Sequence, residues 1–192
     1  MTPVSGGYQV LMIDPPWPQK KGGKRAAYPN QGRDLDYSTM SMTEIFALLD
    51  SKIFPLATPA HSVFLWAIEK FLPETLASMA DRGYKRHATL IWDKENGIAP
   101  AFTVRYSHEY LAWFYKSPMV PVSTEVRGKI ATVFREKPRE HSRKPDTAYR
   151  IVERLYPSAS RLDVFSRQPR HGWDQFGDQV DFFCADTSEG AK

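Results

Sequence analysis

A short apolar segment near the N-terminus ends at two consecutive prolines. Residues 9–13 are Gln-Val-Leu-Met-Ile, and Asp14, Pro15 and Pro16 follow directly. Because proline has no backbone N–H to donate to a sheet, the segment is expected to be a buried strand that stops at Asp14. The sequence therefore predicts a carboxylate at the carboxyl end of a buried strand.

Segments with helical signals alternate with strand-like segments along the rest of the chain. Ser41-Met-Thr-Glu44 has the form of a capping box, which starts a helix. The expected helices cover about 41–49, 73–83 and 145–157, and the expected strands 62–66, 88–92, 110–115, 130–134 and 161–165. This alternation predicts an α/β fold with a mostly parallel sheet flanked by helices, whose ligands bind at the carboxyl ends of the strands.

Length and composition restrict the class of protein. The 192 residues, 42% of them hydrophobic, predict a single domain over 1–192, with its core at about 8–181 and a flexible tail at 182–192. Cys184 is the only cysteine, which excludes an internal disulfide and a cysteine-based zinc cluster. The sequence shows neither a signal peptide nor an apolar stretch that could span a bilayer, so a cytoplasmic location is expected.

The positive charge of the chain is concentrated in two segments. The formal net charge is +4. One cluster contains Lys20, Lys21, Lys24 and Arg25, and the other contains Arg127, Lys129, Arg135, Lys137, Arg139, Arg143 and Lys144. Either cluster alone is more simply explained as solvated surface. Two basic loops beside a strand-end carboxylate favour contact with phosphates.

The tetrad Asp14-Pro15-Pro16-Trp17 suits the methylation of an aromatic amine, whose lone pair is delocalised into the ring. Two acceptors for the amine N–H groups favour the pyramidal geometry in which the lone pair is available, and Asp14 and the Pro15 carbonyl are candidates. The proline rings hold that carbonyl rigidly, and Trp17 offers a face for a purine. The alternative is a simple turn, which would be preferred for Asp-Pro or Pro-Pro alone.

Four motifs, in order, resemble the MT-A70 family of adenine methyltransferases, and the resemblance is to a compact, bacterial or phage-like member. They are Asp14-Pro15-Pro16-Trp17, 105–113 with His108-Glu109-Tyr110-Leu111, Arg143-Lys144-Pro145-Asp146, and 161–167 with 172–179. The resemblance implies a Rossmann-like methyltransferase fold that uses S-adenosylmethionine, with a permuted order in which the catalytic strand precedes the cofactor strand. It also implies methylation of the N6 amine of adenine.

The resemblance also implies a set of cofactor-binding residues. These are Asp14, Lys144, Asp163, Phe165, Arg167, His171, Asp178 and Gln179. In the family pattern, Lys144 binds the cofactor carboxylate, Arg167 reaches the ribose, and Asp14 contacts both the cofactor and the target amine. Asp178 stands at a position that is often asparagine.

The long loops at 18–40, 93–107 and 117–143 are expected to bind nucleic acid. An adenine inside a duplex cannot reach the cofactor, so the target base is flipped out or already single-stranded. The candidate substrate contacts are Lys20, Lys21, Lys24, Arg25, Tyr28, Tyr37, Arg105, Tyr106, His108, Glu109, Arg139 and Arg143. The resemblance implies that Glu109 helps to hold the adenosine. The alternative, given equal weight, is that Glu109 forms an ion pair with a loop arginine such as Arg105. The five histidines show no metal-binding spacing, and no metal is expected.

The expected substrate is DNA, because the sequence shows no RNA-binding module such as a zinc finger, and RNA is the alternative. A catalytically silent nucleic-acid-binding subunit is a second alternative, which the intact tetrad disfavours. A methyltransferase for small molecules or proteins is a third, which the basic loops disfavour. The sequence shows no separate target-recognition domain. A homodimer or a partner subunit is therefore expected to supply the recognition of a particular nucleic-acid sequence.

Overall fold

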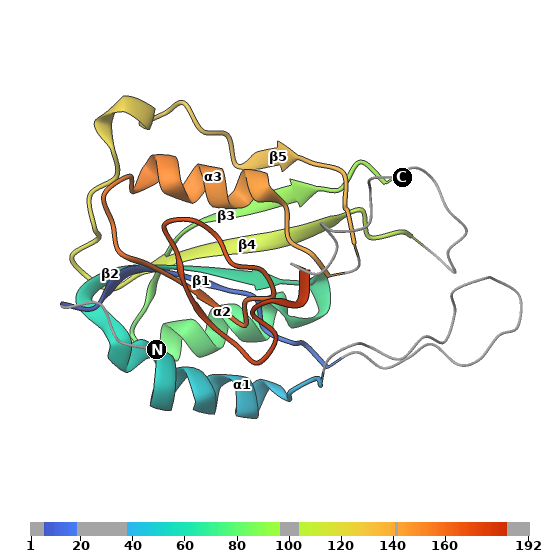
Figure 1. Cartoon of the computed structure of the whole chain (residues 1–192), viewed down its shortest axis with the longest axis horizontal. Coiled ribbons are helices and arrows are strands. Elements are labelled where there is room, and N and C mark those ends of the chain that lie inside the picture. Colours follow the sequence, from blue (N-terminus) through green and yellow to red (C-terminus); the bar gives the residue numbers. More distant parts are fainter. Residues whose placement is uncertain (1–5, 19–37, 97–103, 141, 184–192) are drawn as a thin grey trace, which may run out of the picture.

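The computed structural model describes residues 6–18, 38–96, 104–140 and 142–183, which form one sheet covered by helices (Figure 1). The strands are β1 (Tyr8–Ile13), β2 (Ala57–Ala67), β3 (Lys85–Asp93), β4 (His108–Tyr115), β5 (Val133–Arg135), β6 (Arg161–Val164) and β7 (Asp174–Phe176). The helices are α1 (Met42–Leu48), α2 (Leu72–Asp81) and α3 (Asp146–Leu155). Shorter helical turns are η1 (Leu49–Ile53), η2 (Phe54–Leu56), η3 (Glu69–Phe71) and η4 (Thr124–Val126).

The sheet is mostly parallel, as predicted. Its strand order is β5-β3-β4-β2-β1-β6-β7. Strand β4 runs antiparallel to both of its neighbours, β2 and β3, whereas the other four pairings are parallel. Helices α1 and α2 cover one face and α3 covers the other (Figure 1). The result is a three-layer α/β arrangement.

Strand β1 is apolar from Val10 to Ile13 because both of its faces are covered there. Leu11 and Ile13 belong to the core under α1 and α2, whereas Val10 and Met12 belong to the core under α3. Successive side chains of a strand point to opposite faces, so a strand between two helical layers needs a continuous apolar run. The next residue, Asp14, therefore leaves the sheet at its carboxyl edge.

The local helix signals act as the sequence indicates. The Ser41 hydroxyl accepts a hydrogen bond from the Glu44 amide, and the Glu44 carboxylate accepts one from the Ser41 amide at 2.7 Å. Pro73 lies in the first turn of α2 and Pro145 caps α3. None of the described helices is long and apolar enough to cross a membrane.

Some element boundaries differ from those expected. Strand β2 begins at Ala57, five residues before the expected start at 62, because it pairs with Tyr8 of β1 across an irregular register. Strand β7 was not expected, since its three residues carry no periodicity and pair along the edge of β6. Strand β6 ends at Val164, because Phe165 has a φ of 60°.

The reversed strand β4 brings distant segments to one edge of the sheet. The carboxyl ends of β1, β3 and β6 meet there, and β4 begins there because it runs the other way. Asp14, Lys94, Glu109 and Phe165 consequently lie along the same edge.

Gly7 directly precedes β1 and packs closely against the backbone of Leu56, so substitutions there test this contact. Its φ is 86°, and a Cβ at this position would lie 2.9 Å from the Leu56 carbonyl oxygen. Gly6 has a φ of 99° but nothing within 4 Å of such a Cβ. Chemical denaturation is expected to show that Gly6→Ala costs about 1 kcal/mol of unfolding free energy and Gly7→Ala about 2–4 kcal/mol. Equal losses would show that the close approach contributes nothing.

Candidate active site

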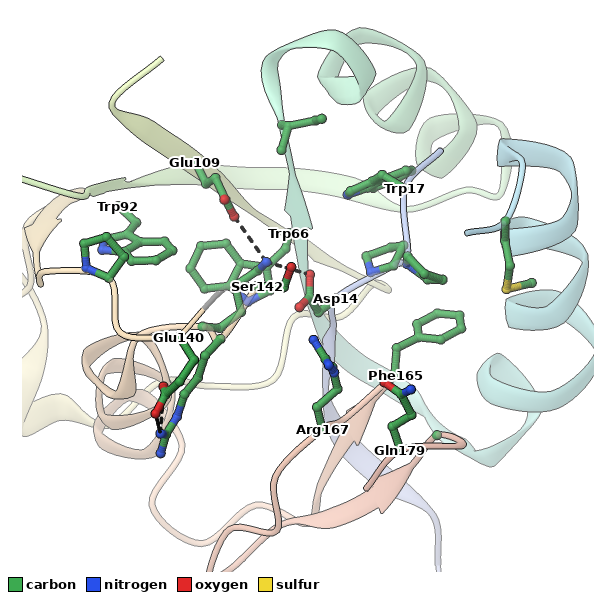
Figure 2. Close-up of a pocket in the computed structure, with 18 of the residues that line it drawn as sticks. Asp14, Trp17, Trp66, Trp92, Glu109, Glu140, Ser142, Phe165, Arg167 and Gln179 are labelled. Carbon is green, nitrogen blue, oxygen red and sulfur yellow. Dashed lines mark hydrogen bonds and ion pairs between the residues drawn. The ribbon is translucent and has the colours of Figure 1, made fainter. Parts of the chain in front are cut away.

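A cavity of about 1120 Å³ opens at the carboxyl edge of the sheet (Figure 2). Its walls come from the ends of β1, β2 and β3, the start of β4, the segments after β6 and β7, and the segment before α3. This volume exceeds the roughly 300–1,000 Å³ usual for one small-molecule ligand. The cavity can therefore hold two ligands side by side.

Four charged side chains form a continuous chain along one wall of the cavity. Lys94 contacts Glu109 at 2.5 Å, Glu109 contacts Lys144 at 3.2 Å, and Lys144 contacts Asp14 at 3.0 Å. Figure 2 shows the carboxylates of Glu109 and Asp14 directed toward the same region of the cavity. The charges alternate and sum to zero, so each carboxylate has a cationic partner in a partly buried setting.

These four groups differ in how their environment shifts their pKa values. Burial raises the pKa of Asp14, and its ion pair with Lys144 only partly offsets this effect. Burial also acts to raise the pKa of Glu109, but the ammonium groups of Lys144 and Lys94 outweigh it and lower that pKa. Burial acts to lower the pKa of Lys144, but Asp14 and Glu109 outweigh it and raise that pKa. Of these two carboxylates, Asp14 therefore takes up a proton more readily than Glu109.

The residues after Asp14 form a tight turn with a packed indole. The Trp17 amide donates to the Pro15 carbonyl at 2.8 Å, and the Met40 amide donates to the Pro16 carbonyl at 2.9 Å. Trp17 is 5% exposed and stacks on Phe71 with ring centroids 5.1 Å apart. The Phe71 side of the indole is thus closed to a ligand. The Pro15 oxygen keeps a second lone pair for a further donor.

The segments after β6 and β7 cross closely beside Asp14. The amides of Phe165 and Ser166 both donate to the Phe176 carbonyl, at 2.6 and 3.3 Å. A Cβ on Gly177 would lie 2.9 Å from the Ser166 carbonyl oxygen, so the crossing requires glycine there. Four residues of the expected cofactor set line the cavity from these two segments: Phe165, Arg167, Asp178 and Gln179. Figure 2 shows Arg167 directed toward Asp14.

Asp163 does not line the large cavity, in contrast to the expectation. It is 2% exposed, accepts a hydrogen bond from the Tyr149 hydroxyl at 3.1 Å, and faces an adjoining cavity of about 20 Å³. Burial raises the pKa of Asp163 to about 7, partly offset by Arg170. Asp163 thus lies beneath the site, where it supports the wall that Arg167 and Asp14 share with the small cavity.

His171 is not brought to the cavity. It is exposed just before β7, and β7 begins beside Leu162, near the amino end of β6. Because the cavity lies at the carboxyl edge, His171 is at the opposite edge of the sheet. We therefore leave His171 out of the cofactor-binding set.

The expected substrate contacts are divided by the structure. Tyr106 is 63% exposed and does not line the cavity, and His108 points to the other face of β4, where its Nε2 contacts the Tyr110 hydroxyl at 2.8 Å. Four of the expected contacts do line it: Arg105, Glu109, Arg139 and Arg143. The candidates Lys20, Lys21, Lys24, Arg25, Tyr28 and Tyr37 lie outside the described residues.

The second basic cluster is partly neutralised by acidic neighbours. Arg139 pairs with Asp146 at 2.8 Å, and Arg143 pairs with Glu140 at 2.9 Å. The pairing gives these arginines a structural role in fixing the segment before α3, besides any role in binding phosphate. Glu109 forms ion pairs with Lys94 and Lys144. These lysines stand where the alternative interpretation had placed a loop arginine such as Arg105.

Lys94, Trp66 and Trp92 line the cavity and were not expected there. Trp66 lies near the end of β2, with its ring centroid 5.5 Å from the Lys144 ammonium nitrogen, and Lys94 directly follows β3. Their position at or just after the carboxyl end of a strand was a signal available in the sequence. Within the described part of the chain, no group of three or more His, Cys, Asp or Glu side chains lies together as metal ligands do.

A mostly parallel seven-stranded sheet, covered on both faces and with a cavity lined by apolar and charged side chains at its carboxyl edge, defines a Rossmann-like α/β fold of the methyltransferase type. The MT-A70 family model matches residues 8–179, and the chain belongs to this family. The assignment confirms the resemblance drawn from the sequence motifs.

Comparison with curated proteins gives relatives of two kinds. The chain is 28% identical over 182 residues to an Arabidopsis thaliana protein named N(6)-adenosine-methyltransferase MT-A70-like, covering 92% of this chain and 24% of that protein. It is 25% identical over 186 residues to the human N(6)-adenosine-methyltransferase catalytic subunit METTL3, covering 93% of this chain and 29% of that protein. It is 19% identical over 188 residues to the type II methyltransferase M.MunI of Mycoplasma sp, covering 90% of this chain and 78% of that protein. The chain thus spans about a quarter of the length of the first two.

Asp163 gives a prediction for stability as a function of pH. Its folded pKa of about 7 lies above the ordinary aspartate value, so its contribution is fully present at low pH and is lost as pH rises through 7. Asp163→Asn mimics the neutral acid. Its unfolding free energy, relative to that of the wild type, is expected to be higher at pH 8 than at pH 5 by on the order of 1–3 kcal/mol. Urea denaturation at both pH values measures this change. A difference that stays constant with pH would contradict a raised pKa.

Proposed function

We propose that this chain transfers a methyl group from S-adenosylmethionine to the N6 amine of adenine in DNA. The observation that carries the proposal is the Asp14 carboxylate at the end of β1, ion-paired with Lys144 inside a cavity large enough for a cofactor and a nucleoside. Membership of the MT-A70 family supports the reaction class.

The side chains that line the cavity have the chemistry needed to hold S-adenosylmethionine, which supplies the methyl group. Arg167 and Gln179 provide donors for ribose hydroxyls and Asp178 provides an acceptor, while Phe165 adds an apolar surface. Lys144 has three N–H donors, one more than its contacts with Asp14 and Glu109 require, and the third suits the cofactor carboxylate. Lys144 therefore compensates both carboxylates and holds the cofactor at once.

In the proposed reaction, Asp14 and the Pro15 carbonyl each accept an N–H of the target amine. These two acceptors would hold the nitrogen with its lone pair directed at the place of the methyl group. Bound S-adenosylmethionine would supply that methyl group to the lone pair, and the electrons of its C–S bond would pass to sulfur. One N–H proton then has to leave. The raised pKa of Asp14 makes its carboxylate a suitable place to hold that proton before it passes to water.

Glu109 and Lys94 serve the adenosine side of the cavity in this proposal. Their contact of 2.5 Å and the lowered pKa of Glu109 keep the carboxylate ionised, as an acceptor for nucleoside hydroxyl or N–H groups. Arg105 and Arg139 line the same cavity and can meet the flanking phosphates.

DNA is proposed as the substrate because a type II methyltransferase is matched over most of its length. RNA is the second candidate, because the relatives with higher identity are named N(6)-adenosine-methyltransferases. A homodimer or a partner subunit, as proposed from the sequence, would add the surface needed to recognise a particular sequence.

Nucleoside analysis by mass spectrometry tests the activity and the substrate together. The protein is incubated with S-adenosylmethionine and separate pools of duplex DNA, single-stranded DNA and RNA. We expect N6-methyladenine in a DNA pool, with a loss of at least about a hundredfold in Asp14→Ala. Product in the RNA pool alone would overturn the DNA assignment. Cofactor binding by calorimetry without product in any pool would favour a subunit that needs a partner.

The pH dependence of kcat/KM tests the role of Asp14. An ionised Asp14 is needed to accept the amine N–H, and burial raises its pKa, so activity is expected to fall with decreasing pH at values above the ordinary aspartate pKa of about 4. The same fall of kcat/KM at low pH is expected in Asp163→Asn, which removes another carboxyl group with a raised pKa. If the fall disappears in this variant, the titrating group is Asp163 and not Asp14.

A further inference from the structure

The last described turn of the chain folds back against the segment that follows β6. The Phe182 amide donates to the Gln179 carbonyl at 3.0 Å, and the Phe183 amide donates to the Arg167 carbonyl at 3.0 Å. Two consecutive aromatic residues are thereby fixed beside Arg167, whose side chain lines the large cavity.

Both rings lie against the Arg167 guanidinium, and Phe182 is the nearer of the two. Its central carbon lies 3.9 Å from the Phe182 ring centroid and 4.8 Å from that of Phe183. The rings are perpendicular to each other, at an angle of 89° with centroids 5.0 Å apart. The guanidinium carbon of Arg143, a second residue of the cavity wall, lies 5.4 Å from the Phe183 centroid.

A guanidinium group uses different parts of its surface for stacking and for hydrogen bonding. Its flat face meets an aromatic ring, whereas its N–H groups donate in the plane, from the edge. A ring that holds the face of Arg167 therefore fixes the plane in which its donors act. In an unstacked arginine this orientation would be set at the time of binding, with a loss of side-chain entropy.

We propose that Phe182 and Phe183 are positioning residues that orient Arg167 for binding the cofactor. This inference rests on the proposed function, in which Arg167 donates to the cofactor ribose. The rings touch the arginine and act through it. Phe182 and Phe183 belong to no motif that suggested the cofactor site.

The different burial of the two rings decides which one is the better probe. Phe183 is 8% exposed and also lines the small cavity next to Asp163, so its removal would disturb packing. Phe182 is 41% exposed, although its ring lies nearest to the guanidinium. A substitution at Phe182 therefore changes the arginine contact with little effect on the core.

The test measures the dissociation constant of S-adenosylmethionine by calorimetry for the wild type, Phe182→Leu and Phe182→Tyr. Leucine keeps the apolar contact but removes the ring, whereas tyrosine keeps the ring. Phe182→Leu is expected to weaken binding about 3- to 10-fold, and Phe182→Tyr less than about twofold. The value of kcat at saturating cofactor and the thermal unfolding temperature are expected to stay close to those of the wild type.

A double-mutant cycle with Arg167→Met shows whether Phe182 acts through the arginine. With the guanidinium removed, Phe182→Leu is expected to cause no further loss of cofactor affinity. An equal loss in both backgrounds, or a Phe182→Leu affinity that matches the wild type, would overturn the inference while leaving the proposed function intact. A wild-type protein that does not bind S-adenosylmethionine would overturn both.

Discussion

Lys144 compensates two carboxylates at the edge of the sheet, and the geometry of the cavity depends on this contact. It lies 3.0 Å from Asp14 and 3.2 Å from Glu109, which come from the end of β1 and the start of β4. Removing one partner from a buried ion pair leaves a charge without compensation, which costs several kcal/mol. The segment before α3 is therefore tied to the middle of the sheet, and it closes one wall of the cavity.

The reversal of β4 makes this arrangement available. In a fully parallel sheet, the first residues of β4 would lie at the amino edge, far from Asp14. Because β4 pairs antiparallel with β2 and β3, Glu109 lies opposite Trp92 and close to Lys94. A single reversed strand thus contributes the second carboxylate of the site, while the parallel strands contribute their carboxyl ends as in other doubly wound folds.

The other side of the cavity is held by close backbone contacts and by an arginine that lies against two aromatic rings, instead of by paired charges. Phe165 takes a φ of 60°, and Gly177 passes so near Ser166 that no side chain fits between them. Arg167 leaves this crossing and rests on Phe182 and Phe183. The proposed cofactor contacts thus lie on closely packed backbone, whereas the proposed target amine meets a carboxylate whose pKa is raised by burial.

The sequence by itself determined the elements that depend on neighbouring residues. Prolines after residues 9–13 ended β1 just before Asp14, the capping box started α1, and ordered motifs placed the chain in the MT-A70 family. Tertiary structure decided which distant residues meet. In the structure, Lys94 pairs with Glu109, Asp163 lies beneath the cavity, and His171 lies at the opposite edge of the sheet. Strand order and the direction of β4 set these positions, and neither leaves a local signal in the sequence.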